Sequence, residues 1–273
     1  MAHTEPLNPL SPFSPSSRFG GRVRDCFNRH AAAYEQGAGL QTAIAARLGQ
    51  LCRSLRPQIP AGPRADLGAG SGLLSRALET SLGGPPLLRL DLCTELLAQE
   101  RSGDPALVHH QLLWDLNSGL PRQLNGAGLL ASSFALQWLE QPPQRLQEWC
   151  RQLQSGGWLV LAVPTAASFP QWRQAAAAAG VPCTALPLPE TDLLINAAAP
   201  HLRLRHQQRL RFLRPYGDGH RFLRQLSQLG AGTSPSPPLS TAQLRGLLAA
   251  WPADGLVSWE VLILIGQRVN HQP

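Results

Sequence analysis

The sequence Asp66-Leu67-Gly68-Ala69-Gly70-Ser71-Gly72 decides the fold. A short apolar run ends in an acid, three glycines alternate through a turn, and an apolar stretch with helical spacing follows from Leu73. Glycines at alternate positions allow a tight strand-to-helix turn and let a ligand approach bare backbone. The helix that begins there points unpaired N–H groups at the turn, which suits an anionic group such as a carboxylate. The acid at the strand end suits a ligand that also carries an ammonium.

The glycine spacing separates this turn from two nucleotide-binding motifs. Counted from Gly68, the dinucleotide fingerprint needs its third glycine at the position of Leu73. A P-loop needs a lysine, and the chain contains none. One small molecule offers a carboxylate and an ammonium together with a ribose and an adenine, namely S-adenosylmethionine (SAM). A glycine-rich turn without a ligand is the alternative that this stretch alone leaves open.

Further acids follow the next two predicted strands. Residues 87–91 form a buried strand that ends at Asp91, 19 residues after Gly72. That spacing fits one helix, one loop and one strand, so a parallel sheet places Asp91 beside the glycine turn, where it can accept hydrogen bonds from ribose hydroxyls. Capping of a following helix at residues 94–99 is the alternative. Residues 106–116 indicate a weaker third strand that places His109 and His110 on opposite faces in structural roles, and Asp115 near its end can accept from an adenine amino group.

The rest of the chain continues an alternating pattern. Residues 128–133 and 158–163 are predicted as the fourth and fifth strands, and the helix between them begins at Pro142-Pro143 and ends at Gly156-Gly157. Five strands mostly separated by helices predict a doubly wound α/β sheet. The later segments are predicted as helices at 172–179, 218–229 and 241–250, a loop at 181–190, and strands at 202–212 and 257–265.

The composition limits the classes of protein to which the chain can belong. With 273 residues and 43% hydrophobic residues, the chain can build a sizeable core, and no apolar run approaches the roughly 18–20 residues of a membrane span. The first residues are rich in Pro and Ser without an apolar core, which predicts a disordered tail and no secretory signal. Five scattered cysteines without CxxC spacing favour a reducing cytoplasm over a disulfide frame or a metal site.

Positive charge is concentrated late in the chain. Residues 201–224 hold seven arginines against Asp218 alone, which is 7 − 1 = +6 of the formal +7. Leucine and phenylalanine alternate with arginine over residues 202–212, which predicts a half-buried strand with Leu202, Leu204, Leu210 and Phe212 inside and a basic outer face. Such a strip implies an acidic macromolecular partner or an anionic substrate, and a solvated arginine-rich face is the alternative.

The three acids and the glycine turn together resemble the ligand-binding series of class I SAM-dependent methyltransferases. The resemblance implies the doubly wound seven-stranded sheet of that class, with the last strand antiparallel, and SAM as cofactor. It implies cofactor contacts by Asp66, Gly68, Gly70, Gly72, Asp91, Leu92, Trp114, Asp115 and Ser133.

A narrower resemblance extends over almost the whole chain. Residues 27–41, 133–138, 219–232, 239–241 and 258–262 are similar to segments of the malonyl-[acyl-carrier protein] O-methyltransferases of biotin synthesis. Two features depart from that family's pattern: Trp259 stands where a tyrosine is more usual, and residues 181–200 match poorly. The organisation that follows is a tail (1–20), a helical cover of the active site (21–58), a SAM-binding core (59–164), an insertion after strand five that includes a late strand (165–238), and a closing helix and strand (239–270).

This resemblance implies a reaction and a partner. The enzyme would methylate the free carboxylate of a malonyl thioester on an acidic acyl carrier protein, early in biotin synthesis. Arg29 and Tyr34 are candidates to position that carboxylate, and Phe134, Gln137 and Trp138 to line the acceptor side. The basic strip would dock the carrier protein through Arg203, Arg205, Arg209 and Arg211. We expect a cytoplasmic monomer without a metal, a nucleic-acid partner or a membrane partner.

Three other functions compete with this one. The first is a SAM-dependent methyltransferase for a free small acid or a quinone precursor, which would show no preference for a carrier. The second is a nucleic-acid methyltransferase, but residues 132–135 read Ser-Ser-Phe-Ala where base-modifying enzymes carry an Asp/Asn-Pro-Pro-aromatic run. The third is a carrier-binding module that has lost SAM, against which the intact glycine turn and strand-end acids argue.

Overall fold

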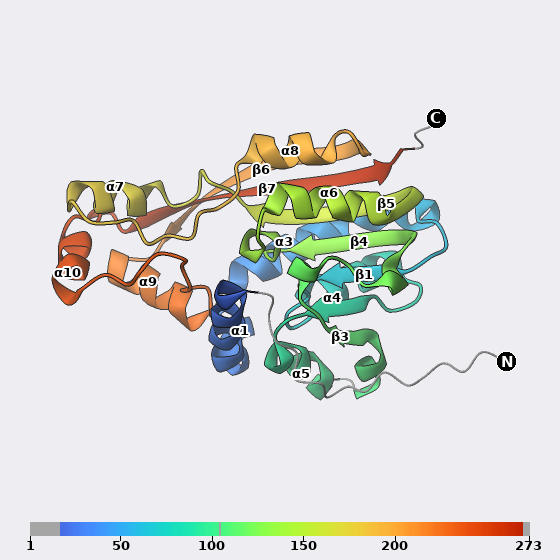
Figure 1. The fold of residues 1–273 in the computed structure, drawn as a ribbon, viewed down its shortest axis with the longest axis horizontal. Coiled ribbons are helices and arrows are strands. Elements are labelled where there is room, and N and C mark those ends of the chain that lie inside the picture. Colours follow the sequence, from blue (N-terminus) through green and yellow to red (C-terminus); the bar gives the residue numbers. More distant parts are fainter. Residues whose placement is uncertain (1–16, 104, 270–273) are drawn as a thin grey trace.

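The computed structural model describes residues 17–103 and 105–269 and is built around one seven-stranded sheet (Figure 1). The strand order is β3-β2-β1-β4-β5-β7-β6; the first five strands are parallel, and β7 runs antiparallel between β5 and β6. The predicted doubly wound sheet with an antiparallel last strand is confirmed. The strands are β1 (Arg64–Leu67), β2 (Leu88–Asp91), β3 (Gln111–Leu113), β4 (Ala127–Ser133), β5 (Leu153–Pro164), β6 (Leu202–Pro215) and β7 (Leu256–Arg268).

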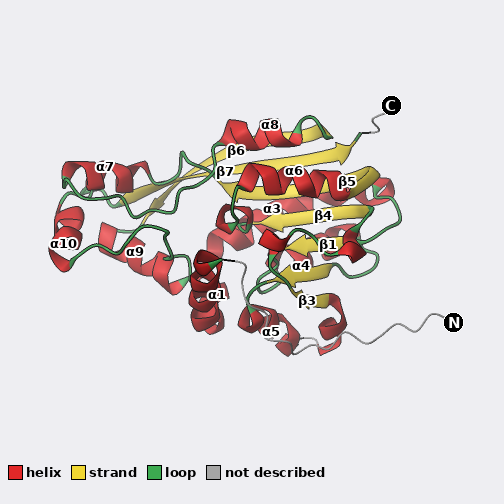
Figure 2. Cartoon of the chain, viewed as in Figure 1, coloured by secondary structure: helices red, strands yellow, loops and turns green. Residues whose placement is uncertain are grey.

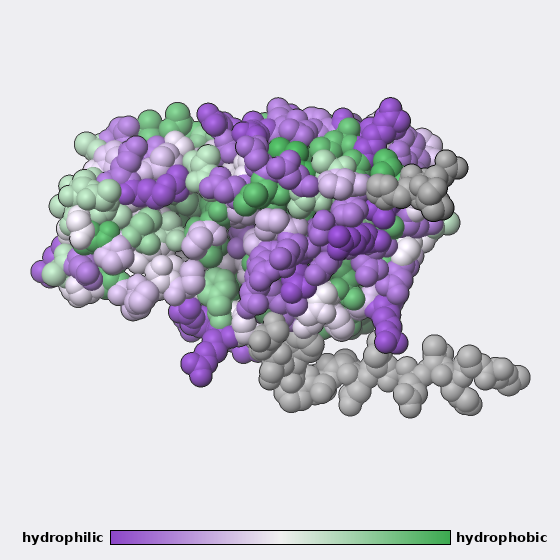
Figure 3. Space-filling model, turned by 45° about the horizontal axis from the view of Figure 1, so that its top comes forward, coloured by the Kyte–Doolittle hydropathy of each residue, from purple (hydrophilic) through white to green (hydrophobic). Residues whose placement is uncertain are grey.

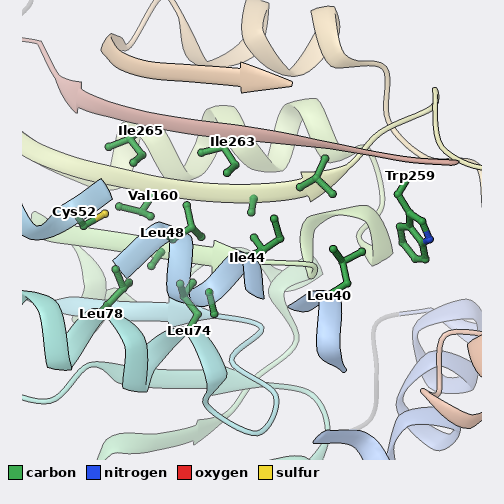
Figure 4. Packing of buried hydrophobic residues seen from close by; sticks show 14 of the residues in the cluster. Leu40, Ile44, Leu48, Cys52, Leu74, Leu78, Val160, Trp259, Ile263 and Ile265 are labelled. Carbon is green, nitrogen blue, oxygen red and sulfur yellow. The ribbon is translucent and has the colours of Figure 1, made fainter. Parts of the chain in front are cut away.

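Helices cover both faces of the sheet (Figure 2). On one face α3 (Gly39–Cys52) packs against α4 (Leu73–Leu82), and on the other α6 (Pro142–Gln152) packs against α8 (Thr191–Ala198). Apolar residues at three-to-four spacing along α3 lie between α4 and the sheet (Figure 4). The labelled members of this cluster are Leu40, Ile44, Leu48, Cys52, Leu74, Leu78, Val160, Trp259, Ile263 and Ile265.

The amino-terminal helices lie at the carboxyl edge of the parallel strands. These are α1 (Arg18–His30) and α2 (Tyr34–Gly37), and α1 packs against α5 (Thr94–Gly103). Of the predicted tail, residues 1–16 lie outside the described part, whereas residues 18–20 belong to α1. This helix begins at Ser17, whose side chain accepts a hydrogen bond from Gly20 N at 3.0 Å.

The carboxyl-terminal half adds a distal lobe, formed by α7 (Pro170–Ala178), α9 (Gly219–Gln228), α10 (Thr241–Ala249) and the ends of β6 and β7 that extend beyond β5 (Figure 1). Its core is aromatic: the Phe169 ring centroid lies 4.5 Å from that of Trp259, and the Phe222 centroid lies 5.0 Å from that of Tyr216 and 5.6 Å from that of Trp251. On the face turned forward in Figure 3, pale and green residues are more frequent over this lobe than over the sheet-bearing half.

Two local predictions are wrong, and one helix was missed. Residues 105–110, including His109 and His110, form a 3₁₀ helix, and β3 is confined to Gln111–Leu113, the three residues that pair with β2. Gly156-Gly157 do not end a helix but lie within β5, where residues 154–157 have no partner in the pairing with β4. Helix α8 was not predicted. The remaining short 3₁₀ helices are Ala31–Ala33, Arg53–Gln58, Leu116–Ser118, Arg122–Leu124 and Leu136–Trp138.

The predicted single basic face of β6 is also wrong. The pairing of β6 with β7 shifts between Leu204 and His206, which leaves Arg205 without a partner. A one-residue irregularity inverts the faces of all residues that follow it. Leu202 and Leu204 therefore pack into the core on the α6 side, whereas Leu210 and Phe212 pack into the core on the α3 side.

The four arginines of the strip are divided by the same irregularity. Arg203 pairs with Gln267, whereas Arg209 and Arg211 pair with Leu262 and Glu260 on the opposite face of the hairpin. Two of these cations also have acidic partners. Arg209 forms an ion pair with Asp192 of α8, and Arg211 Nε lies 2.8 Å from Glu260 Oε2.

A buried charge network fixes the helices around β2. Arg89 of β2 is only 1% exposed and donates to Glu100 of α5 at 2.9 Å and to Glu79 of α4 at 2.8 Å. Removing one partner would leave a buried charge uncompensated. The network therefore fixes the positions in which α4 and α5 pack against β2. Among the helices of the described part, none is both long and apolar enough to cross a membrane.

Candidate functional site

The glycine turn after β1 opens a cavity at the carboxyl edge of the sheet. Gly68, Gly70 and Gly72 have φ angles of +75°, +57° and +82°, a region that favours glycine. The turn is attached to the neighbouring strand because Gly68 N and Ala69 N both donate to Leu90 O, at 2.8 and 3.0 Å. Backbone N–H groups and the start of α4 are thereby held at the mouth of the turn, as its sequence predicted.

Asp91 lies beside this turn at the end of β2. Its carboxylate oxygens accept from Gly70 N at 2.7 Å and from Cys93 N at 2.8 Å. Burial raises the pKa of this carboxyl, and the backbone donors oppose that shift. The carboxylate therefore satisfies the N–H of Cys93, which directly precedes α5, and since each oxygen can accept more than one hydrogen bond, it also has capacity for ligand hydroxyls.

Asp66 is the second buried acid of the cavity. It is fully buried, and Oδ2 accepts from Ser75 Oγ at 2.8 Å, whereas Oδ1 has no hydrogen-bond partner among the described residues. Burial raises the pKa of this carboxyl to about 7, against the smaller opposing effects of Ser75 and Arg89. A buried acceptor without a donor is costly, and a ligand ammonium would satisfy it.

The cavity gathers nearly all of the predicted cofactor residues and measures about 950 Å³, including space open to solvent. Asp115 lies on its wall and accepts from Asn117 N at 2.9 Å, and Ser133 Oγ is buried there without a partner. Gly72 does not line the cavity; its left-handed conformation begins α4, and a Cβ there would lie 2.0 Å from Glu100 Oε1. The predicted residues on the lining are Asp66, Gly68, Gly70, Asp91, Leu92, Trp114, Asp115 and Ser133.

Helix α1 covers this cavity. Phe27 and Tyr34 line it, and their ring centroids are 6.2 Å apart. Burial, and secondarily the charge of Asp91, raise the pKa of the Tyr34 phenol well above its usual value, so the hydroxyl keeps its proton. The arginine of α1 on the lining is Arg24, which pairs with Asp25. Arg29 is exposed and lines neither this cavity nor the next, so its position does not support the predicted contact with an acceptor carboxylate.

A second cavity of about 640 Å³, including open space, adjoins the first and is called the acceptor cavity below. The predicted acceptor residues Phe134, Gln137 and Trp138 all lie on its wall. Gln137 Nε2 donates to Phe134 O at 2.7 Å, whereas Gln137 Oε1 is buried without a partner. The two cavities meet at side chains that line both, which are Phe27, Tyr34, Gln41, Phe134 and Trp138.

Several residues of the acceptor cavity were missed by sequence reasoning. Gln41 at the start of α3 was quoted only as the end of a resembling segment, and no spacing rule singles it out. The others come from the distal lobe, which brings together segments far apart in the chain. They are Phe169, Trp172, Thr184, Leu226, Leu229, Thr233 and Trp259, of which Leu226, Leu229 and Trp259 belong to the resembling segments but were given no role in the site.

Comparisons with known proteins agree with this geometry. Residues 65–161 match a family model described as a methyltransferase domain. A biotin biosynthesis bifunctional protein BioCD from Bordetella avium is 30% identical over 90% of this chain and 51% of its own length. A malonyl-[acyl-carrier protein] O-methyltransferase from Magnetococcus marinus is 27% identical over 84% of this chain and 85% of its own length.

The chain spans about half the length of several of the curated relatives it matches, including the Bordetella protein. Among solved structures, a putative methyltransferase from Bacillus halodurans superposes with a TM-score of 0.57 at 12% identity. That superposition covers 83% of this chain and 99% of the other, and at this identity it supports the fold alone.

Proposed function

The chain belongs to the class I SAM-dependent methyltransferases, and from this premise we propose that it forms the methyl ester of the free carboxylate of a malonyl thioester on acyl carrier protein. The class of acceptor comes from the names of the relatives in Bordetella and Magnetococcus. The chemistry of the acceptor cavity supports it independently.

The observation that carries the proposal is that the acceptor cavity offers no general base. Among the described residues on its lining, Tyr34 is the one ionisable group, and its raised pKa keeps it neutral. An amine or phenol would have to lose a proton before or during methylation, which calls for a base. A malonyl carboxylate is already ionised at neutral pH and needs none.

The first cavity suits the cofactor. We propose that Asp66 receives its ammonium, Asp91 its ribose hydroxyls and Asp115 its adenine amino group. The partnerless Oδ1 of Asp66 and Oγ of Ser133 are buried polar atoms that such a ligand would satisfy. When bound, SAM supplies a methyl group activated by its sulfonium.

At the junction of the cavities, Tyr34 and Gln41 are neutral hydrogen-bond donors from the helical cover. We propose that they orient the acceptor carboxylate. Its charge is lost as the new O–CH₃ bond forms, so a buried cation would stabilise the ground state more than the transition state. Neutral donors orient the carboxylate and stabilise the charged ground state less than a cation would.

Aromatic side chains close the junction against water. The ring centroid of Phe27 lies 5.5 Å from that of Trp138 in an edge-on arrangement, and Phe134 lines both cavities. Alignment of the acceptor in a dry site accounts for most of the rate enhancement that such a displacement requires.

Mass spectrometry of malonyl-acyl carrier protein incubated with the enzyme and SAM tests the proposal. We expect a gain of one methyl group on the acyl chain, with the ester sensitive to an esterase. Acetyl-acyl carrier protein, which has no free carboxylate, is the matched control. Methylation of a free small acid alone would support the alternative function and exclude this one.

A further inference from the structure

An open groove, called the entry groove below, leads from the surface to the acceptor cavity. It lies between α1, α9 and residues 232–239. In Figure 1, α1 stands beside α9 at the boundary between the sheet-bearing half and the distal lobe. The groove shares five lining residues with the acceptor cavity, which are Trp172, Thr184, Leu226, Gly232 and Thr233. The entry groove, the acceptor cavity and the cofactor cavity therefore follow one another in series.

Two arginines of α1 stand at the outer part of this groove. Arg22 and Arg29 both line it and are exposed, and they lie seven residues apart, which places them on the same side of the helix about two turns from one another. Within residues 17–103 and 105–269, neither forms an ion pair. Asp25 also lines the groove between them, and its carboxylate is paired with Arg24 at 2.8 Å. Arg22 lies over the Phe19 ring at 5.7 Å, which directs the guanidinium along the helix surface.

Where the groove meets the acceptor cavity, its lining is uncharged. There it combines apolar side chains such as Trp172 and Leu226 with the hydroxyls of Thr184 and Thr233. A ligand that matches this order has an anion at its outer end and a long, uncharged, partly polar chain leading inwards. Arginine is the side chain best suited to bind a phosphate through paired hydrogen bonds.

We propose that the entry groove receives the phosphopantetheine arm of the carrier protein, with Arg22 and Arg29 binding its phosphodiester and the malonyl thioester reaching the acceptor cavity. This inference rests on the proposed function, and it adds the route of the substrate and the residues that recognise the arm. It also gives Arg29 a role at the entrance to the site in place of the carboxylate contact that its position does not support.

The test compares malonyl-phosphopantetheine with malonyl-pantetheine, which lacks the phosphate, in wild type and in the double variant Arg22→Gln/Arg29→Gln. We expect the wild type to prefer the phosphorylated arm by about tenfold or more in kcat/KM, as charge-assisted hydrogen bonds would give. The double variant should lose that preference while its kcat/KM for malonyl-pantetheine stays within about twofold of wild type. Arg122→Gln, an exposed arginine remote from the groove, is the matched control and should keep the preference.

Each outcome decides between the two proposals. A double variant that keeps the wild-type preference for the phosphorylated arm overturns the assignment of the entry groove, even if malonyl esters are formed. A wild-type enzyme that methylates neither thioester and leaves malonyl-acyl carrier protein unchanged overturns the proposed function and the groove with it. SAM affinity and thermal unfolding of each variant show that it is folded, and the single variants Arg22→Gln and Arg29→Gln should each lose part of the preference.

Discussion

The two cavities of the site are built in different ways. The cofactor cavity is formed mainly by a backbone turn and by carboxylates at the ends of adjacent parallel strands, and apart from its helical cover its lining falls within residues 66–139. The acceptor cavity is formed almost entirely by side chains from the cover, the segment after β4 and the distal lobe, and Tyr34 is the one ionisable group on its described lining. Charge and fixed backbone geometry serve the cofactor, whereas neutral, apolar surroundings serve the acceptor.

The difference teaches how such a fold separates the binding of the cofactor from the recognition of the acceptor. A sheet edge can hold acids and N–H groups in place without further support, because the strands themselves set their spacing. An acceptor pocket must exclude water and be complementary in shape to one substrate, which requires large side chains from several segments. Changes in the first cavity should therefore act on SAM binding and folding, and changes in the second on the acceptor.

The largest effect should follow from Asp91→Ala. Loss of two hydrogen bonds to a charged acceptor, each worth about 1.5–3 kcal/mol, should weaken SAM binding by roughly 100-fold or more. Isothermal calorimetry measures this, and thermal unfolding separates it from the loss of the bonds that Gly70 N and Cys93 N donate to the same side chain. If the variant binds SAM within tenfold of wild type, Asp91 serves only to hold the glycine turn and the segment before α5.

The glycine turn offers a matched pair of substitutions. A Cβ at Gly68 would lie 2.2 Å from the Ala135 Cβ, whereas one at Gly70 would meet nothing closer than 3.8 Å. We expect Gly68→Ala to lower the free energy of unfolding by about 2–4 kcal/mol, through left-handed strain and overpacking together. Gly70→Ala should lower the free energy of unfolding by about 1–2 kcal/mol, because only the left-handed strain applies there. Urea unfolding distinguishes them, and equal losses would show that the Ala135 contact relaxes without cost.

Asp66 predicts opposite pH dependences for SAM binding and for stability. With a pKa of about 7, this carboxyl is largely protonated below neutrality, so SAM affinity should fall about tenfold per pH unit below 7. Because the folded pKa is raised above the ordinary value of 3.8, its ionisation opposes folding. The contribution of the protonated Asp66 carboxyl to the free energy of unfolding is complete below about pH 4 and is lost as the pH rises through 7.

Calorimetry with SAM between pH 5.5 and 8, beside thermal unfolding of the cofactor-free protein, measures both trends. Asp66→Asn is the control: it should flatten both profiles and weaken binding at pH 8. Binding that is independent of pH in the wild type would show that Asp66 does not pair with the ammonium.

Much of the fold and of the cofactor cavity could be predicted from the sequence because local rules determine them. The glycine turn requires positive φ angles, and the spacing to Asp91 allows one helix and one strand, so both features follow from residues close in the chain. The same reasoning placed Asp66, Asp91 and Asp115 at one sheet edge, where the structure has them. Gly72 does not lie on the lining of the cavity, and its contact with Glu100 of α5 is one that no local pattern predicts.

The acceptor side could not be predicted because non-local packing determines it. One unpaired residue, Arg205, inverts the faces of β6, and no composition rule reveals such an irregularity in an alternating strand. Helix α8 follows a proline-rich loop and is set by packing against α6. Gln41 reaches both cavities only because α2 and α3 fold back across the sheet edge, a consequence of tertiary structure alone.

On the acceptor side, Tyr34→Phe removes one hydroxyl from the junction of the cavities. Loss of a hydrogen bond to an ionised carboxylate should lower kcat/KM for malonyl-acyl carrier protein about tenfold, while SAM affinity stays within about threefold. Steady-state kinetics with each substrate varied in turn provides the measurement. An equal loss for both substrates would mean that the phenol serves the cofactor cavity.

The smallest effect should come from the strip on β6, whose docking role stays a prediction. Arg209 and Arg211 already pair with Asp192 and Glu260, so much of their charge is offset before a carrier protein approaches. A solvent-exposed charge contact with the carrier contributes about 0–1 kcal/mol. The double variant Arg209→Gln/Arg211→Gln should therefore raise KM for malonyl-acyl carrier protein only about two- to threefold at low salt and leave malonyl-pantetheine unaffected. Kinetics across a salt series provides the measurement: an unchanged KM for the carrier at low salt removes the strip from docking, whereas a tenfold rise would make β6, and not the entry groove, the principal contact with the acidic carrier.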